Sequence, residues 1–372
     1  MTRTAILYIT AATAALAGPA LAQDGARISQ LEARIAQLEA AQNGGSGPKL
    51  TFGAGTATDV EFYGYIKTDF IADFGAELGD TTFPLAALTS DDNGTFFNAT
   101  VRQTRLGFRT TTPTAFGDLG TQVEIDFYGP DQIEPRIRHA TATLGGFRVG
   151  QYWTTFMPIA SYPVTLDFQG VAGIPFARQE MIRYTYDAGA FVGEVAIEES
   201  NADSDDPVLI ATAAYDTDPL LVKLAALYGT VNAPDGTETD VNGFNLSATA
   251  KLWEGGTIDA SYTNGDGIAS YMVFGGNNLN ADGDAIGLQS AYIGLSQAVN
   301  DKLTLRAIYG WRDNDEGADD DFETLTSVHL NAQYQLLENT VVGLEYFHGT
   351  VDRFSGATFE VDRLQASVQI DF

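Results

Sequence analysis

The sequence contains no cysteine, and this absence removes several classes of structure and chemistry. Disulfide scaffolds, thiol nucleophiles and thiolate-bound metal sites are all excluded. Basic residues are also scarce, with 20 lysines and arginines against 49 aspartates and glutamates, so the formal net charge is -29. A basic surface for DNA or RNA is therefore missing, and we expect no nucleic-acid partner.

The sequence also lacks the signatures of common hydrolases. It has three histidines, His139, His329 and His348, and neither a Gly-x-Ser-x-Gly elbow nor a His-Glu-x-x-His pair. His329 shares the inward phase of its expected strand with Ser327 and Asn331, whereas His139 and His348 fall on the outward phase. We therefore expect no enzymatic activity, no catalytic residue and no cofactor.

No apolar run is long enough for a transmembrane helix, which needs about 20 residues. The run nearest the N-terminus, residues 5–17, follows Arg3 and precedes the small-x-small sequence Ala20-Leu21-Ala22. This pattern is typical of a secretory signal peptide, which we assign to residues 1–22. The protein is therefore expected outside the cytoplasm.

Residues 23–42 have the spacing of a short coiled-coil helix. Apolar residues follow a 3-4-3 pattern at Ile28, Leu31, Ile35 and Leu38. Two heptads are marginal alone, so we expect the coil to form only where a larger assembly holds the chains together. Isoleucine and leucine at these positions favour two-stranded coils, and a lone amphipathic helix is the other interpretation. A Gly/Ser-rich linker at residues 43–59 is expected to separate the coil from the rest.

From Val60 onward the hydrophobic period changes to two. Phe62, Ile66 and Phe70 alternate with charged residues such as Lys67 and Asp69, as in a strand with one face in lipid. The same alternation recurs at residues 121–127, 191–198, 244–252, 342–346 and 364–372, whereas residues 208–216 and 285–297 hold no single phase. Short and long connections between these segments also alternate.

This rhythm predicts an all-β fold, a transmembrane antiparallel β-barrel of about 16 strands over residues 60–372, preceded by the short N-terminal α-helical coiled coil. A soluble β-sandwich would explain the alternation but neither the loop rhythm nor the C-terminal Phe372. The expected location is the outer membrane of a Gram-negative bacterium, with the coil in the periplasm. Membrane lipid and lipopolysaccharide are the expected surroundings.

Arginines are concentrated between Val101 and Tyr186, where eight of the 20 basic residues lie. Strand phase turns most of them inward, because the opposite phase would place them in lipid at a cost of roughly 2–4 kcal/mol each. The expected lumenal cations are Lys67, Arg105, Arg109, Arg136, Arg138, Arg148, Arg178 and Arg183, and the opposing carboxylates are Asp167, Glu124 and Asp126.

The segment 154–178 is rich in proline, glycine and aromatic residues and has no clear period, so we interpret it as a constriction loop folded into the lumen. Lumenal cations in a narrow pore focus the field and raise the local concentration of anions. The sequence therefore predicts a passive channel for small anionic solutes. In the alternatives, the arginines pair with wall carboxylates and are electrically silent, or a sealed barrel serves as a structural tether.

A second charged segment, residues 312–323, is strongly acidic. Its carboxylates include Asp313, Asp315, Asp319, Asp320 and Asp321. Oxygen clusters of this kind suit hard cations, so this loop could share Ca²⁺ or Mg²⁺ with lipopolysaccharide. The EF-hand pattern is not met, and a solvated acidic loop is the other interpretation.

Several motifs resemble those of DcaP-like porins, and the resemblance is specific over residues 60–186. The matching segments are Phe62-Tyr63-Gly64-Tyr65-Ile66-Lys67, Arg102-Gln103-Thr104-Arg105-Leu106-Gly107-Phe108, Arg136-Ile137-Arg138-His139-Ala140, Gly150-Gln151-Tyr152-Trp153 and Thr165-Leu166-Asp167-Phe168. The resemblance implies a homotrimer of 16-stranded outer-membrane porins that passes small anions such as dicarboxylates. No residue distinguishes dicarboxylate from phosphate or sulfonate.

Overall fold

The computed structural model describes residues 46–52, 57–90, 94–130 and 133–372. The expected signal peptide and the coiled-coil positions Ile28, Leu31, Ile35 and Leu38 lie outside this part of the chain. The described residues form 18 strands and three short 3-10 helices. None of the helices in these ranges is long and apolar enough to cross a membrane.

The strands are β1 (Ser46–Phe52), β2 (Thr58–Phe74), β3 (Thr95–Thr100), β4 (Arg105–Thr114), β5 (Gly117–Asp126), β6 (Arg136–Leu144), β7 (Phe147–Trp153), β8 (Arg178–Asp187), β9 (Phe191–Glu198), β10 (Val208–Asp216), β11 (Leu220–Asn232), β12 (Glu238–Trp253), β13 (Gly256–Asp266), β14 (Gly287–Ala298), β15 (Leu303–Asn314), β16 (Phe322–Leu337), β17 (Thr340–Arg353) and β18 (Thr358–Asp371). The 3-10 helices are η1 (Leu85–Ala87), η2 (Ile159–Ser161) and η3 (Ala269–Tyr271).

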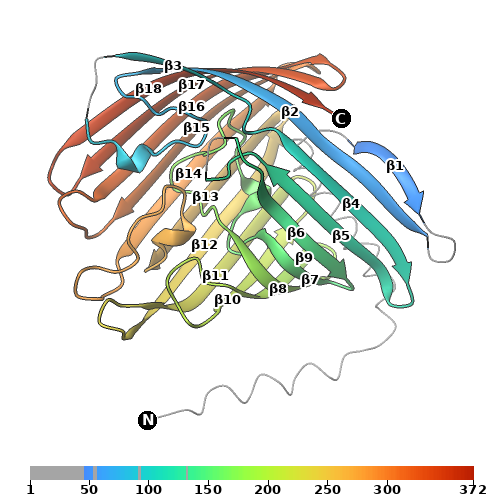
Figure 1. Ribbon diagram of the computed structural model, residues 1–372, viewed down its shortest axis with the longest axis horizontal. Helices are drawn as coiled ribbons and strands as arrows, with labels where there is room; N and C mark the ends of the chain where they lie inside the picture. Colours follow the sequence, from blue (N-terminus) through green and yellow to red (C-terminus); the bar gives the residue numbers. More distant parts are fainter. Residues whose placement is uncertain (1–45, 53–56, 91–93, 131–132) are drawn as a thin grey trace, which may run out of the picture.

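These strands form a closed antiparallel barrel (Figure 1). Consecutive strands from β4 to β18 pair with one another, and β18 closes the barrel by pairing with β2 from Tyr65 to Phe74. β3 and β4 occupy one position beside β2, since β3 pairs with its second half and β4 with its first. The barrel thus has 16 strand positions, which confirms the predicted architecture.

Strand β1 lies inside the segment that the sequence suggested to be a linker, residues 43–59. It pairs with Thr58–Tyr63 of β2, along the edge that β18 does not reach because β18 ends at Asp371 opposite Tyr65. An exposed strand edge carries unpaired backbone donors and acceptors, and β1 satisfies them. The Gly/Ser composition of the segment gave no sign of this pairing.

The two faces of the wall follow the predicted alternation. Phe62 and Ile66 on β2 are 45% and 53% exposed on the outer face, whereas Lys67 and Asp69 are 3% and 0% exposed on the lumenal face. Gly64 marks a close approach between strands, because a Cβ there would lie 2.3 Å from the carbonyl oxygen of Arg105. This approach explains a glycine in the middle of an apolar strand.

Three connections fold into the lumen instead of remaining outside it. They are residues 75–90 with η1, residues 154–177 with η2, and residues 267–286 with η3. We call residues 154–177 the inward loop. Apolar residues of these connections pack on apolar side chains of the wall, and they form three buried clusters. The lumen therefore contains a packed core in addition to polar side chains.

Candidate functional site

The inward loop crosses the barrel and bonds to the opposite wall. The Asn331 side chain on β16 donates to the carbonyl of Val164 at 2.9 Å, and the N–H of Leu166 donates to Glu345 Oε2 on β17 at 3.1 Å. Further along the loop, Ser290 on β14 donates its hydroxyl to the carbonyl of Gly173 at 2.8 Å. These bonds satisfy backbone groups that a buried loop could not otherwise pair.

A β-bulge positions the central arginine of the facing wall. On β6, His139 pairs with Glu124 and Ile137 pairs with Ile125, which leaves Arg138 as the extra residue. Arg138 points into the lumen, where its Nε donates to Glu124 Oε1 at 2.6 Å and its Nη1 donates to Asp126 Oδ2 at 3.0 Å. The predicted carboxylates thus compensate the charge of this arginine.

One carboxylate of this pair, Asp126, also binds a second arginine. Arg136 binds Asp126 through two parallel hydrogen bonds, from Nε at 3.0 Å and from Nη2 at 2.8 Å. Bidentate pairs of this kind are among the stronger charge-assisted interactions. Some of the lumenal arginines are therefore paired with carboxylates, which is one of the alternatives considered from the sequence.

Four guanidinium groups gather around the ring of Phe168 on the inward loop. The guanidinium carbons of Arg105, Arg136, Arg138 and Arg178 lie 5.7, 5.7, 5.1 and 5.8 Å from its centroid. Arg178 also lies 4.2 Å from the ring of Trp153, and its Nε and Nη2 have no hydrogen-bond partner among the described residues. We call Arg105, Arg138 and Arg178 the arginine cluster. A lumen cavity adjoins it and is lined in part by Lys67, Arg105, Arg138, Trp153, Asp167 and Phe168.

The remaining predicted arginines also lie against aromatic side chains. Arg148 and Arg183 lie 4.1 and 5.6 Å from the ring of Tyr152, and Arg109 lies 4.1 Å from the ring of Tyr63. The Nε of Arg183 is also 3.5 Å from an oxygen of Glu194. Stacking on aromatic faces orients the guanidinium groups without neutralising them.

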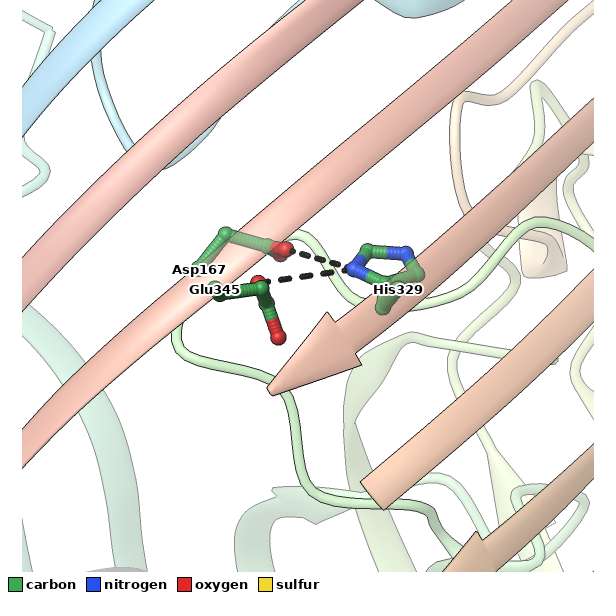
Figure 2. A group of neighbouring side chains, drawn as sticks. All are labelled: Asp167, His329 and Glu345. Carbon is green, nitrogen blue, oxygen red and sulfur yellow. Dashed lines mark hydrogen bonds and ion pairs between the residues drawn. The ribbon is translucent and has the colours of Figure 1, made fainter. Parts of the chain in front are cut away.

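Two of the predicted lumenal charges hold the inward loop. Lys67 lies 3.2 Å from Asp69, and its Nζ donates to Gln103 at 2.6 Å and to the carbonyl of Leu166. The Asp167 carboxylate lies beside His329 and Glu345, as Figure 2 shows. Burial acts to raise the pKa of the Asp167 carboxyl, but the His329 imidazole and the N–H of Gly170 outweigh it, so this pKa lies below its usual range.

Two expectations from strand phase have different outcomes. His348 lies on the outer face as expected, beside Asp362. His139 was expected to face outward, and this was wrong: it is 1% exposed and packs on Tyr152 and Trp153. The bulge at Arg138 shifts the alternation by one residue and accounts for the error.

The acidic segment 312–323 does not gather its carboxylates around one point. Asp315 accepts the N–H of Gly287, and Asp321 accepts the N–H of Ala318 and the side chain of Asn277. Among the described residues, the one group of three or more ligand side chains close enough for a metal is Asp167, His329 and Glu345.

Comparison with known proteins identifies the family of this barrel. The family model described as DcaP outer membrane protein matches residues 26–368. The chain belongs to the DcaP outer membrane protein family. No curated protein matches this sequence. This DcaP-family barrel is similar to the crystal structure of the outer membrane channel DcaP of Acinetobacter baumannii, with a TM-score of 0.77 and 21% identity over 85% of this chain and 97% of that chain.

Other solved porins share the fold of this DcaP-family chain. An anion-selective porin from Comamonas acidovorans matches with a TM-score of 0.63 and 16% identity, over 85% of this chain and all of that chain. The trimer form of OmpT from Vibrio cholerae matches with a TM-score of 0.58 and 16% identity, over 85% of this chain and 99% of that chain. The protein is therefore an outer-membrane barrel of porin type.

Sequence reasoning missed several residues of the DcaP-family site. The aromatic partners of the arginines, Tyr152, Trp153 and Phe168, carried no signal of their own, although all three lie in the motifs that indicated the family. Glu345 alternates with apolar residues in a regular strand, which placed it inward but could not show that it meets the inward loop. Contacts between a loop and a distant wall leave no local pattern.

Proposed function

We propose that this protein is a passive outer-membrane channel with a preference for small anionic solutes. The observation that carries this proposal is the arginine cluster, whose three guanidinium groups lie around Phe168 and in which Arg178 has two buried donors without a partner in the described part of the chain. Buried donors without partners are costly, and an anion that reached Arg178 from the cavity lined by Arg105 and Arg138 would supply acceptors. The cavity beside the cluster is the expected solute path.

Electrostatics supports the proposed direction of selectivity. A unit charge at about 5 Å from an anion changes its energy by about 0.8 kcal/mol even at the dielectric constant of water, which is roughly fourfold in occupancy. Glu124 and Asp126 compensate Arg136 and Arg138, whereas Arg178 has no carboxylate among the described ion pairs. The cluster as a whole therefore retains positive potential toward the lumen.

The test compares uptake of solutes into proteoliposomes that contain the full-length protein. Swelling rates are measured for a dicarboxylate, a diamine of similar size and an uncharged sugar. We expect the dicarboxylate to enter faster than the diamine, and Arg178→Ala to reduce the ratio of their swelling rates by at least about fourfold, the factor for a single negative charge. Lys251→Ala is the matched control, because it removes one positive charge from an exposed pair with Asp218 and is expected to leave the ratio unchanged.

Each result of this test has a definite meaning. A diamine that enters faster than the dicarboxylate would contradict the proposal, as would an Arg178→Ala ratio equal to that of Lys251→Ala. Swelling by none of the solutes would indicate a sealed barrel, the structural tether considered from the sequence. Unchanged uptake of the uncharged sugar in both variants would establish that the pore itself is intact.

We also propose that the functional unit is a homotrimer. A trimer form is described for the similar OmpT of Vibrio cholerae, and the spacing of residues 23–42 suits a coil between chains. Native mass spectrometry of the detergent-solubilised protein tests this, and a monomer as the only species would contradict it.

A further inference from the structure

A buried group of three side chains lies where the inward loop meets β16 and β17. Asp167 comes from the loop, His329 from β16 and Glu345 from β17, and they are 3%, 0% and 1% exposed (Figure 2). His329 Nδ1 lies 3.2 Å from Asp167 Oδ2 and 3.5 Å from Glu345 Oε1. All three ligand atoms lie within 4.8 Å of one another.

Other bonds orient both carboxylates toward this point. Asp167 Oδ1 accepts the N–H of Gly170 at 2.5 Å, and Glu345 Oε2 accepts the N–H of Leu166 at 3.1 Å and the side chain of Asn331 at 2.9 Å. Each carboxylate therefore uses one oxygen for support and presents the other to His329. Outer bonds of this kind fix the ligands of metal ions in proteins.

A proton alone would fit this group poorly. The Nδ1 atom carries at most one hydrogen, yet two carboxylate oxygens face it, and Asp167 Oδ2 has no partner other than His329 among the described residues. Both distances exceed the usual length of a charge-assisted hydrogen bond, about 2.7–2.9 Å. They match instead the separation of about 3.3 Å between ligands on a tetrahedral ion with bonds of about 2.0–2.1 Å.

We propose that Asp167 Oδ2, His329 Nδ1 and Glu345 Oε1 bind one divalent transition-metal ion of the zinc class, which fastens the inward loop to the barrel wall. The donor set favours such an ion over Ca²⁺ or Mg²⁺, because those ions prefer six or more oxygen ligands and this group offers a nitrogen and two oxygens. The ion balances the two carboxylate charges. Asp167 also lines the lumen cavity, which provides a route of entry.

Metal content of the full-length protein in detergent tests this site without dependence on anion selectivity. The protein is stripped with a chelator, reloaded with Zn²⁺, desalted and analysed by mass spectrometry for bound zinc. We expect one ion per chain in the unmodified protein and loss of the ion in His329→Gln and in Asp167→Asn. His348→Gln is the matched control, because this histidine lies on the outer face and the variant should retain the ion.

Cobalt supplies a second measurement that needs no variant. Co²⁺ in a site of nitrogen and oxygen ligands with tetrahedral geometry gives visible absorption bands, which we expect in the unmodified protein and in His348→Gln.

Zinc retention in His329→Gln equal to that of the unmodified protein would overturn the proposal. The absence of both bound zinc and cobalt absorption bands from the folded unmodified protein would also overturn it. If no metal ion binds, a protonated His329 bridges the two carboxylates. Loss of the ion in His348→Gln alone would place it on the outer surface and would overturn the proposal as well.

Discussion

At the scale of single residues, the lumenal charges divide according to what they contact. Arg136 and Arg138 share Asp126, Arg138 also binds Glu124, and Lys67 is bonded to Asp69 and the inward loop. Arg178 instead faces aromatic rings. Strand phase predicted that Lys67, Arg136 and Arg138 point inward. It could not predict which of them are paired, because pairing depends on the neighbouring strand and on the loop.

Removal of the Arg138 side chain should strongly destabilise the barrel. Arg138→Ala leaves Glu124 and Asp126 buried with less compensation, and the loss of one partner from a buried ion pair costs about 3–5 kcal/mol. The free energy of unfolding is measured by urea titration in lipid vesicles. Lys251→Ala, which breaks an exposed pair, should cost no more than about 1 kcal/mol. Equal losses in the two variants would contradict the role of burial.

The stability of the lumenal loops at alkaline pH should depend on Tyr271 of η3. Burial raises the pKa of Tyr271 from 10.0 to about 12, so the folded state holds this proton more tightly than the unfolded chain. Its contribution to stability is complete below pH 10.0 and is lost as the pH rises through about 12.

The titration of tyrosinate absorbance checks this expectation. The difference between the curves of the unmodified protein and Tyr271→Phe should have its midpoint near 12. A midpoint near 10.0 would mean that solvent reaches this side chain.

At the scale of secondary-structure elements, the alternation of apolar and polar residues fails in strands that pack against a loop inside the lumen. Residues 208–216 show no single phase, and the structure gives the reason. Val208 and Ile210 on β10 face inward, where they pack with Ile268 and Met272 of the third lumenal connection. A strand whose lumenal face meets an apolar loop is apolar on both faces, so it shows no alternation of apolar and polar residues by which it could be recognised.

Close packing between the inward loop and the wall predicts a steric effect at Gly173. Its φ is 85°, and a Cβ there would lie 2.3 Å from the carbonyl oxygen of Trp311 on β15. Gly236 has almost the same φ, 83°, but open space around it, so Gly236→Ala reports backbone strain alone. We expect Gly173→Ala to reduce the free energy of unfolding by about 1–3 kcal/mol more than Gly236→Ala. Equal losses in urea titration would show that the loop does not pack against β15.

At the scale of the whole molecule, the arginine cluster lies inside a strongly acidic protein. The net charge is -29, yet the arginine cluster lies within about 6 Å of one aromatic ring. The Debye length is about 10 Å at 0.1 M salt and about 3 Å at 1 M. If the cluster sets selectivity, anion preference should weaken as KCl rises between these concentrations. Selectivity that shifts toward anions with added salt would mean that the acidic outer loops oppose and outweigh the cluster.

The barrel and its strand count could be predicted because both rest on local signals. The alternation at Phe62 and Ile66 and the turns between strands repeat along the whole chain. The contacts of the site could not be predicted in this way. Asp167 and His329 are separated by 162 positions in the sequence and meet only because a loop crosses the barrel. Likewise, one inserted residue at Arg138 reversed the expected face of His139.

The most direct test of the central claim is the zero-current potential of the purified protein in a planar bilayer under a KCl gradient. The arginine cluster predicts a sign that corresponds to chloride preference, and Arg105→Ala and Arg178→Ala should each reduce its magnitude. A sign that corresponds to potassium preference would contradict the account, because the acidic loops would then control the pore.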